Sequence, residues 1–179
     1  MTGPLLATDQ RLRAPAATRP FHVVLVEPEI PPNTGNIARL CGATGCPLHL
    51  VGPLGFRIDE HAVRRAGLDY WHLVEVQRHT TLADCERYVG TQATEAPHQA
   101  RSWLLTGRAR RSIYDAAFRL GDALVFGRES VGLPEALLLE RADWVVGIPT
   151  LGQVRSLNLA NAVSIVLYEA LRQNGLLRV

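Results

Sequence analysis

Six short apolar runs recur along the chain, separated by segments of helical or loop character. They cover residues 22–26, 48–51, 73–76, 103–106, 123–126 and 144–148. Strands that alternate with helices usually form a mostly parallel sheet, because each helix carries the chain back across one face of that sheet. The alternation therefore predicts an α/β fold, with a mostly parallel sheet covered by helices on both faces.

Helices are predicted in the segments between these runs. Thr34 is expected to cap a helix that ends near Gly45. The prolines of the preceding Glu-Pro-Glu-Ile-Pro-Pro are expected to keep the backbone extended and to exclude a helix there. Further helices are expected over 59–67, 82–89, 134–139 and 157–174.

Length and composition favour one folded domain over residues 21–179, behind a flexible leader over 1–20. With 47% apolar residues in a chain of 179, a single core can form. The leader lacks the apolar segment of a signal peptide, and no run approaches the ~20 apolar residues of a membrane span. The 3 cysteines form no Cys-x-x-Cys pair, which argues against a disulfide framework or a zinc knuckle. We expect a cytoplasmic protein with no metal and no membrane partner.

The charged residues exclude one type of chemistry and limit how nucleic acid could be bound. All 19 basic residues are arginine, so mechanisms that need a lysine amine, such as Schiff-base formation, are excluded. Against 17 acidic residues the net charge is only +2, and the leader carries that surplus, so RNA affinity must come from local clusters. The densest cluster includes Arg108, Arg110 and Arg111, which we expect to bind RNA. The alternative is that these three arginines form an ordinary solvated surface.

The last predicted helix is apolar nearly all the way round. Its apolar residues include Leu159, Val163, Ile165, Val166 and Leu171. Such a helix needs burial on two sides. We expect the sheet to cover one side and a second copy of the chain to cover the other, which predicts a homodimer. The alternative is that the chain covers both sides of the helix itself.

Three segments carry polar residues and glycines that a plain core does not need. The first, residues 33–39, follows the first strand and places Asn36 and Arg39 on one helix face. Ligands of α/β proteins commonly bind there, beyond the carboxyl ends of the strands. The alternative is that Asn33 and Thr34 only cap the helix and that Arg39 is solvated.

The second segment, residues 126–134, has two glycines that allow close approach of the backbone to a ligand, with Glu129 between them. It matches neither a dinucleotide fingerprint nor a nucleoside-triphosphate loop, and its alternative is a simple capped turn. The third segment, residues 148–158, brings Arg155, Ser156 and Asn158 to a helix N-terminus that can attract an anion. Ser156 as a plain cap is the alternative, but this leaves Asn158 and Asn161 unexplained in an apolar helix.

In this order, the three segments resemble the motifs of the SPOUT class of RNA methyltransferases, most closely the branch that methylates the 2′-hydroxyl of the tRNA wobble ribose. The similarity runs from about Phe21 to Gln173 and includes EPEIPPNTGNIARLC, RRAGLDYW, FGRESVGLP and IP-x₅-RSLNLANAVSIVLYEALRQ. It implies a single-domain SPOUT fold with a C-terminal deep trefoil knot, a homodimer, and S-adenosylmethionine bound in the knot. The product of that cofactor would be S-adenosylhomocysteine.

The resemblance also assigns roles to residues of this chain. It implies a cofactor pocket formed by Leu105, Thr106, Gly127, Ile148, Ser156 and Leu157. It implies a catalytic Arg39, supported by Asn36, Glu129, Arg155 and Asn158. The implied substrates are leucine-type tRNAs with cytidine or 5-carboxymethylaminomethyluridine at the wobble position. The chain departs from the family pattern at Gln153-Val154, where a more polar pair is usual, at Leu157 and at Arg108.

The implied reaction can be compared with the residues present. Methyl transfer to a ribose needs the 2′-oxygen aligned with the sulfonium methyl and an acceptor for the hydroxyl proton, and it needs no metal. Arg39 as the base is chemically demanding, since a guanidinium stays protonated in proteins. The alternative is that an RNA phosphate takes the proton while Arg39 orients that phosphate. Two other functions stay open: methylation of another tRNA or rRNA ribose, and a catalytically silent knotted RNA-binding dimer.

Overall fold

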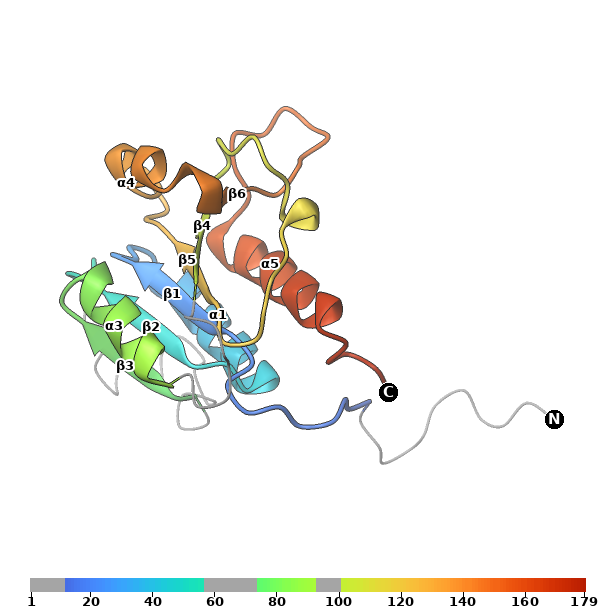
Figure 1. The fold of residues 1–179 in the computed structure, drawn as a ribbon. Coiled ribbons are helices and arrows are strands. Elements are labelled where there is room, and N and C mark those ends of the chain that lie inside the picture. The colour runs from blue at the N-terminus through green and yellow to red at the C-terminus, as the bar shows by residue number, and fades with distance from the viewer. Residues whose placement is uncertain (1–11, 57–73, 93–100) are drawn as a thin grey trace.

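The computed structural model describes residues 12–56, 74–92 and 101–179, and within them a six-stranded sheet (Figure 1). The strands lie in the order β3-β2-β1-β5-β4-β6, and every neighbouring pair is parallel. Their bounds are β1 His22–Val26, β2 Leu48–Val51, β3 Val76–His79, β4 Ser102–Leu105, β5 Ala123–Phe126 and β6 Val145–Val146. The predicted parallel α/β sheet is confirmed.

Helices cover both faces of the sheet. On one face, α1 (Pro31–Thr44) and α5 (Leu159–Gln173) pack together and contribute Ile37 and Val163 to the larger core cluster. On the other face lies α3 (Leu82–Gln92) (Figure 1). Its Cys85 and Val89 pack against strand residues. The short helix α4 (Glu135–Glu140) borders this second cluster. Two 3₁₀ turns, Ile113–Asp115 and Ala142–Trp144, complete the described elements.

Several predicted boundaries agree with the structure. The strands over 22–26, 48–51 and 123–126 have the predicted bounds. The helix predicted over 82–89 is present and continues to Gln92, and the first helix ends at the left-handed Gly45 as expected. The strand predicted over 103–106 is β4, displaced by one residue, and the helix predicted over 134–139 is α4, for which Pro134 is the N-cap. The helix predicted over 59–67 lies outside the described residues.

The start of α1 corrects two predictions. The prolines do not exclude a helix, because Pro31 and Pro32 occupy its first turn, where a missing N–H removes no intrahelical bond. Ile30 is the N-cap, and Thr34 lies inside the first turn with its amide donating to the Ile30 carbonyl, so Thr34 is not the cap.

Three further boundaries were wrong. The strand predicted over 73–76 is displaced, since β3 runs from Val76 to His79. The strand predicted over 144–148 is shortened to Val145–Val146. The last helix begins at Leu159 and not at residue 157, and its N-cap is Asn158, whose Oδ1 accepts from the amides of Ala160 and Asn161. This cap explains Asn158 locally, while Asn161 lies exposed on the helix surface.

Candidate active site

Three loops meet where β1 and β5 end. They are the β1–α1 connection at residues 27–30, the loop at 127–134 that follows β5, and the segment that leads into α5. Because β1 and β5 are parallel neighbours, their carboxyl ends lie at the same edge of the sheet. This is the usual ligand position of a parallel α/β sheet, as the sequence predicted.

Glu129 joins the loop after β5 to the start of α1. Its Oε2 accepts from the Glu29 amide at 2.8 Å, and its Oε1 accepts from the Ile30 amide at 3.3 Å and from Asn33 Nδ2 at 3.0 Å. Amides at a helix start lack intrahelical partners, and a carboxylate is the best acceptor for them. Glu129 therefore positions the start of α1.

Asn33 extends this connection to α5. While its Nδ2 donates to Glu129, its Oδ1 accepts from Asn158 Nδ2 at 2.9 Å. Asn33 is buried, and its partners lie 96 and 125 residues further along the chain. We call these three residues the Glu129–Asn33–Asn158 bridge. The sequence pattern predicts only a cap at Asn33 and does not predict this connecting role, although an asparagine directly after two prolines is a signal that could have indicated it.

A second set of contacts ties the same two loops together. Ser130 donates both its amide and its hydroxyl to the Glu29 carboxylate, at 3.0 and 2.9 Å. Arg128 forms an ion pair with Glu27. Glu29 accepts both bonds from Ser130 and donates its own amide to Glu129, and these bonds fix the register of one loop on the other.

Gly127 is sterically required at the end of β5. A Cβ at this position would lie 2.2 Å from the Gly132 carbonyl carbon and 2.3 Å from the Leu133 nitrogen. The loop folds back on itself here, with the Gly132 amide donating to the Arg128 carbonyl at 2.9 Å. The first glycine of the FGRESVGLP segment is therefore required by close approach of the loop's own backbone. The predicted close approach to a ligand stays a prediction.

Four of the six residues predicted to bind the cofactor lie at or near the ends of three adjacent strands. Leu105 ends β4 and Thr106 follows it, Gly127 follows β5, and Ile148 lies two residues beyond β6. A Cβ at Gly147 would lie only 2.6 Å from the Thr106 oxygen. The backbone at Gly147 therefore lies against that of Thr106 and leaves no room for a side chain. We call the strand-end positions 105–106, 127 and 147–148 the backbone cradle.

Ser156 and Leu157 lie in the segment that approaches this cradle. A Cβ at Gly107 would lie 3.7 Å from the Arg155 carbonyl oxygen, which brings the segment before α5 beside the end of β4. Ser156 is exposed and Leu157 is half-buried. The cofactor-binding role predicted for Ser156 and Leu157 stays a prediction.

Asn36 and Arg39 lie on the exposed side of α1, three residues apart. Ile37 and Cys41 of the same helix are buried, as the sequence predicted. Arg155 is exposed on the segment before α5. The described contacts join Glu129 and Asn158 through Asn33, and they do not join either residue to Asn36 or Arg155.

The arginines predicted to bind RNA have different surroundings. Arg108 is 63% exposed and lies 3.8 Å from Glu135, and Arg110 is exposed. Arg111 donates to the Asp115 carbonyl at 2.8 Å and lies 5.4 Å from the Trp103 ring centroid, so it also supports its own loop.

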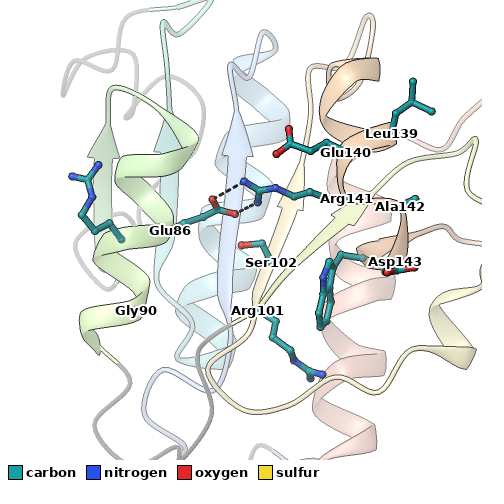
Figure 2. A pocket seen from close by; sticks show the side chains of 11 residues that line it. Glu86, Gly90, Arg101, Ser102, Leu139, Glu140, Arg141, Ala142 and Asp143 are labelled. Atoms are coloured by element: carbon teal, nitrogen blue, oxygen red, sulfur yellow. Dashed lines mark hydrogen bonds and ion pairs between the residues drawn. The ribbon is translucent and has the colours of Figure 1, made fainter.

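A hollow of about 620 Å³ lies elsewhere, between α3 and the segment that follows α4 (Figure 2). The Arg141 guanidinium reaches the Glu86 carboxylate in it, with bonds of 2.5 and 3.2 Å. None of the predicted site residues lines this hollow. It is separate from the cradle at the strand ends.

Among the described residues, no helix is long and apolar enough to cross a membrane.

The fold and these strand-end loops define an α/β protein with a candidate ligand site at the carboxyl ends of its parallel strands. Residues 20–168 match the SpoU rRNA methylase family, and the chain therefore belongs to that family. This agrees with the resemblance seen in the sequence.

Curated relatives cover nearly the whole chain. A protein of Acidovorax sp. is 48% identical over 161 residues, covering 88% of this chain and 94% of the relative, and it is named tRNA (cytidine(34)-2′-O)-methyltransferase. A Yersinia pestis protein of the same name is 44% identical and covers 87% of this chain and 94% of the relative.

Solved structures agree in fold. One, described as giving insight into the 2-OH methylation of C/U34 on tRNA, is 45% identical, with a TM-score of 0.76 over 87% of this chain and 96% of that chain. The SpoU methyltransferase AviRb of Streptomyces viridochromogenes, in complex with the cofactor AdoMet, is 27% identical. Its TM-score is 0.71 over 94% of this chain and 63% of that chain.

Proposed function

We propose that this protein is an S-adenosylmethionine-dependent methyltransferase that modifies the ribose 2′-hydroxyl of tRNA nucleotide 34, a cytidine or a modified uridine. The observation that carries the proposal is the Glu129–Asn33–Asn158 bridge beside the backbone cradle. Relatives at 44–48% identity with this named activity support the choice of substrate.

The cradle residues would hold the cofactor, which supplies an electrophilic methyl group when bound. Leu105, Thr106, Gly127 and Ile148 would bind it mainly through main-chain groups, and Ser156 and Leu157 would close the pocket. Both Gly127 and Gly147 keep the backbone at distances that no side chain allows. Holding the methyl and the 2′-oxygen in line would supply much of the rate enhancement.

The proposed roles of the polar residues follow from their positions. Glu129 and Asn158 are positioning residues, because Glu129 is bonded to α1 and Asn158 caps α5. Arg39 and Asn36, on the exposed side of α1, would contact the RNA. Arg39 would orient an RNA phosphate and stabilise negative charge on the 2′-oxygen as the hydroxyl proton leaves. Arg155, exposed near the cradle, would hold a second phosphate.

We propose that a homodimer completes this site. The exposed residues Asn161, Ile165, Tyr168 and Arg172 form one stripe along α5, with the spacing of neighbouring helical turns. Ile165 and Tyr168 remain 37% and 47% exposed, although α5 packs on α1 and the sheet. A second copy on this stripe would bury both residues. Wild-type protein that sediments as a monomer at micromolar concentration would contradict the dimer. The Tyr168→Glu variant is expected to sediment mainly as a monomer under conditions in which the wild type is a dimer.

The RNA surface, the knot and the cellular location belong to the same proposal. Arg108 and Arg110 are the better candidates for phosphate contacts, because Arg111 is partly engaged in its own loop. The proposal also includes one domain over residues 21–179, with a deep trefoil knot, behind a leader over 1–20. It places the protein in the cytoplasm, where tRNA is available.

Incubation of the purified enzyme with labelled methyl donor and unmodified tRNA, followed by nucleoside mapping, tests the activity. We expect label on the ribose of nucleotide 34. Arg39→Ala is expected to abolish transfer while leaving cofactor affinity within about twofold of wild type, since Arg39 lies outside the cradle. Arg78→Ala, an exposed arginine on β3, is the matched control and should keep full activity. Label on a base, or full activity of Arg39→Ala, would refute the proposed reaction or the proposed role.

A further inference from the structure

Three histidines form a continuous chain across the sheet face that α3 covers. His22 of β1 and His49 of β2 face each other with Nδ1 and Nε2 2.9 Å apart, and His49 Nδ1 lies 3.0 Å from His79 Nε2 of β3. The parallel register places the three rings on one face of the sheet. His49 pairs with Val24, two residues after His22, and His79 pairs with Val51, two residues after His49. The reaction proposed above uses none of these residues.

Cys85 of α3 lies beside two of these rings. One ligand atom from each of His49, His79 and Cys85 lies within 4.8 Å of the other two. Cys85 and His49 are fully buried, whereas His79 is half-buried at the end of its strand. Tyr88, one turn further along α3, packs its ring 5.8 Å from His49 and 5.4 Å from His79.

We propose that His49, His79 and Cys85 form a binding site for a zinc-like divalent cation. Two imidazoles and one thiolate are a ligand set that Zn²⁺ prefers, with metal–nitrogen distances of about 2.0–2.1 Å and a metal–sulfur distance of about 2.3 Å. Ligand atoms of a tetrahedral site lie roughly 3.3–3.7 Å apart, so the facing nitrogens must separate slightly and the sulfur must move inward by about 1 Å. Two strands and one helix supply the ligands, and water can take the fourth position on the half-buried side at His79.

The cation would bind two imidazoles directly, but it must displace the proton of the Cys85 thiol. Burial lowers the pKa of His49 to about 3, and it also lowers that of His79, so both imidazoles are neutral and have a lone pair for the metal. Burial raises the pKa of the Cys85 thiol to about 12. Binding therefore forms two metal–nitrogen bonds and one metal–sulfur bond, and it releases the Cys85 proton to solvent.

His22 supplies a second argument for a metal site. A histidine that binds metal through one ring nitrogen usually donates its other N–H to a nearby acceptor, which fixes its tautomer. If His49 binds through Nδ1, its Nε2–H points at His22 Nδ1, 2.9 Å away. His22 would then be a positioning residue for the metal ligand.

This site differs from the expectation drawn from cysteine spacing. Its ligands come from separate elements and not from a Cys-x-x-Cys motif. It lies among the side chains of the α3 face, whereas α1 and α5 cover the opposite face. The cation would therefore tie β2 and β3 to α3, and methyl transfer would not pass through it.

Titration of untagged, chelator-treated enzyme with Co²⁺ as a spectroscopic probe tests the proposal. We expect one equivalent to bind, with a thiolate-to-cobalt charge-transfer band and the intense visible bands of a tetrahedral site, and Zn²⁺ should displace both. Cys85→Ser should lose the charge-transfer band, while the matched control Cys46→Ala, a buried cysteine of the other core cluster, should keep it. His22→Ala should weaken Zn²⁺ binding by about 10–100-fold without removing the charge-transfer band.

Wild-type protein that gives no charge-transfer band overturns the proposal, whatever the variants do. A band that persists in Cys85→Ser also overturns it, because another thiol would then be the ligand. Zn²⁺ should raise the melting temperature of the wild type and of Cys46→Ala but not that of Cys85→Ser. These measurements need neither tRNA nor methyl donor, so they stand apart from the test of the proposed function.

Discussion

Exchange of Asn33 tests the Glu129–Asn33–Asn158 bridge, because substitution by alanine and substitution by aspartate should destabilise the protein for different reasons. Asn33→Ala removes one bond to a carboxylate, at 3.0 Å, and one bond between amides, at 2.9 Å. Bonds to charged groups contribute about 1.5–3 kcal/mol and neutral ones about 0.5–1.5 kcal/mol. We expect the free energy of unfolding to fall by about 2–4 kcal/mol, to a similar extent at all pH values near neutrality.

Asn33→Asp keeps the shape of the side chain but replaces the donor that faces Glu129 with a second carboxylate. Two unit charges 3.0 Å apart repel by about 5 kcal/mol at an effective dielectric constant near 20. The pKa of the new carboxyl at position 33 should therefore rise well above its usual range. A carboxyl whose pKa is raised on folding destabilises the native state at high pH and ceases to do so once it is protonated. The deficit relative to wild type should therefore be large at pH 8 and smaller by at least about 2 kcal/mol at pH 5.

Urea unfolding followed by tryptophan fluorescence measures both variants against wild type at each pH. Comparison at the same pH removes the acid sensitivity that all three proteins share. If both variants show the same deficit at pH 8 and pH 5, the donor does not face Glu129 as described. If Asn33→Asp is as stable as wild type at pH 8, the bridge does not hold the site together.

Three further predictions concern the cradle, the RNA surface and the histidine chain. In Gly127→Ala the new Cβ would lie 2.2 Å from a carbonyl carbon, so this variant should have a lower melting temperature and a lower cofactor affinity. Gly152→Ala has open space at its Cβ and should leave both quantities unchanged. Thermal unfolding and calorimetry measure them. Arg110→Ala should weaken tRNA binding for all sequences and reduce the slope of log K against log salt by about 1, and an unchanged slope removes Arg110 from the RNA surface. Burial lowers the pKa of His22 to about 4 and that of His49 to about 3, so metal-free protein should lose stability as the pH falls below 6.5. The loss should reach about 2 kcal/mol for each of these histidines at pH 5, and denaturant unfolding that is equally stable at pH 7 and pH 5 contradicts it.

The sequence predicted the bounds of those strands that are buried along their whole length. β2 and β5 are buried on both faces, so their apolar runs mark their ends correctly. β3 was displaced because it is an edge strand of sequence Val-Gln-Arg-His, which lacks an apolar run. The start of α1 was missed because prolines interrupt a helix interior but fit its first turn.

The site was only partly visible in the sequence for a different reason. Segments that follow strands could be predicted to gather at one sheet edge, and Glu129 and Asn158 do meet there through Asn33. The hydrogen-bond partners of each side chain depend on strand order and register between segments about a hundred residues apart. Local sequence patterns do not encode this order and register. The histidine chain was missed in the same way, because its members lie 27 and 30 residues apart and only parallel pairing aligns them.

The central claim, methylation of the nucleotide 34 ribose, is tested most directly by removing the atom that accepts the methyl group. Two synthetic tRNAs should be compared, identical except that one carries 2′-deoxyribose at nucleotide 34. With labelled methyl donor, the all-ribose tRNA should gain one methyl group per molecule, and the deoxy-substituted tRNA should bind with similar affinity but gain none. Equal labelling of the two tRNAs would place the methyl group elsewhere and contradict the account.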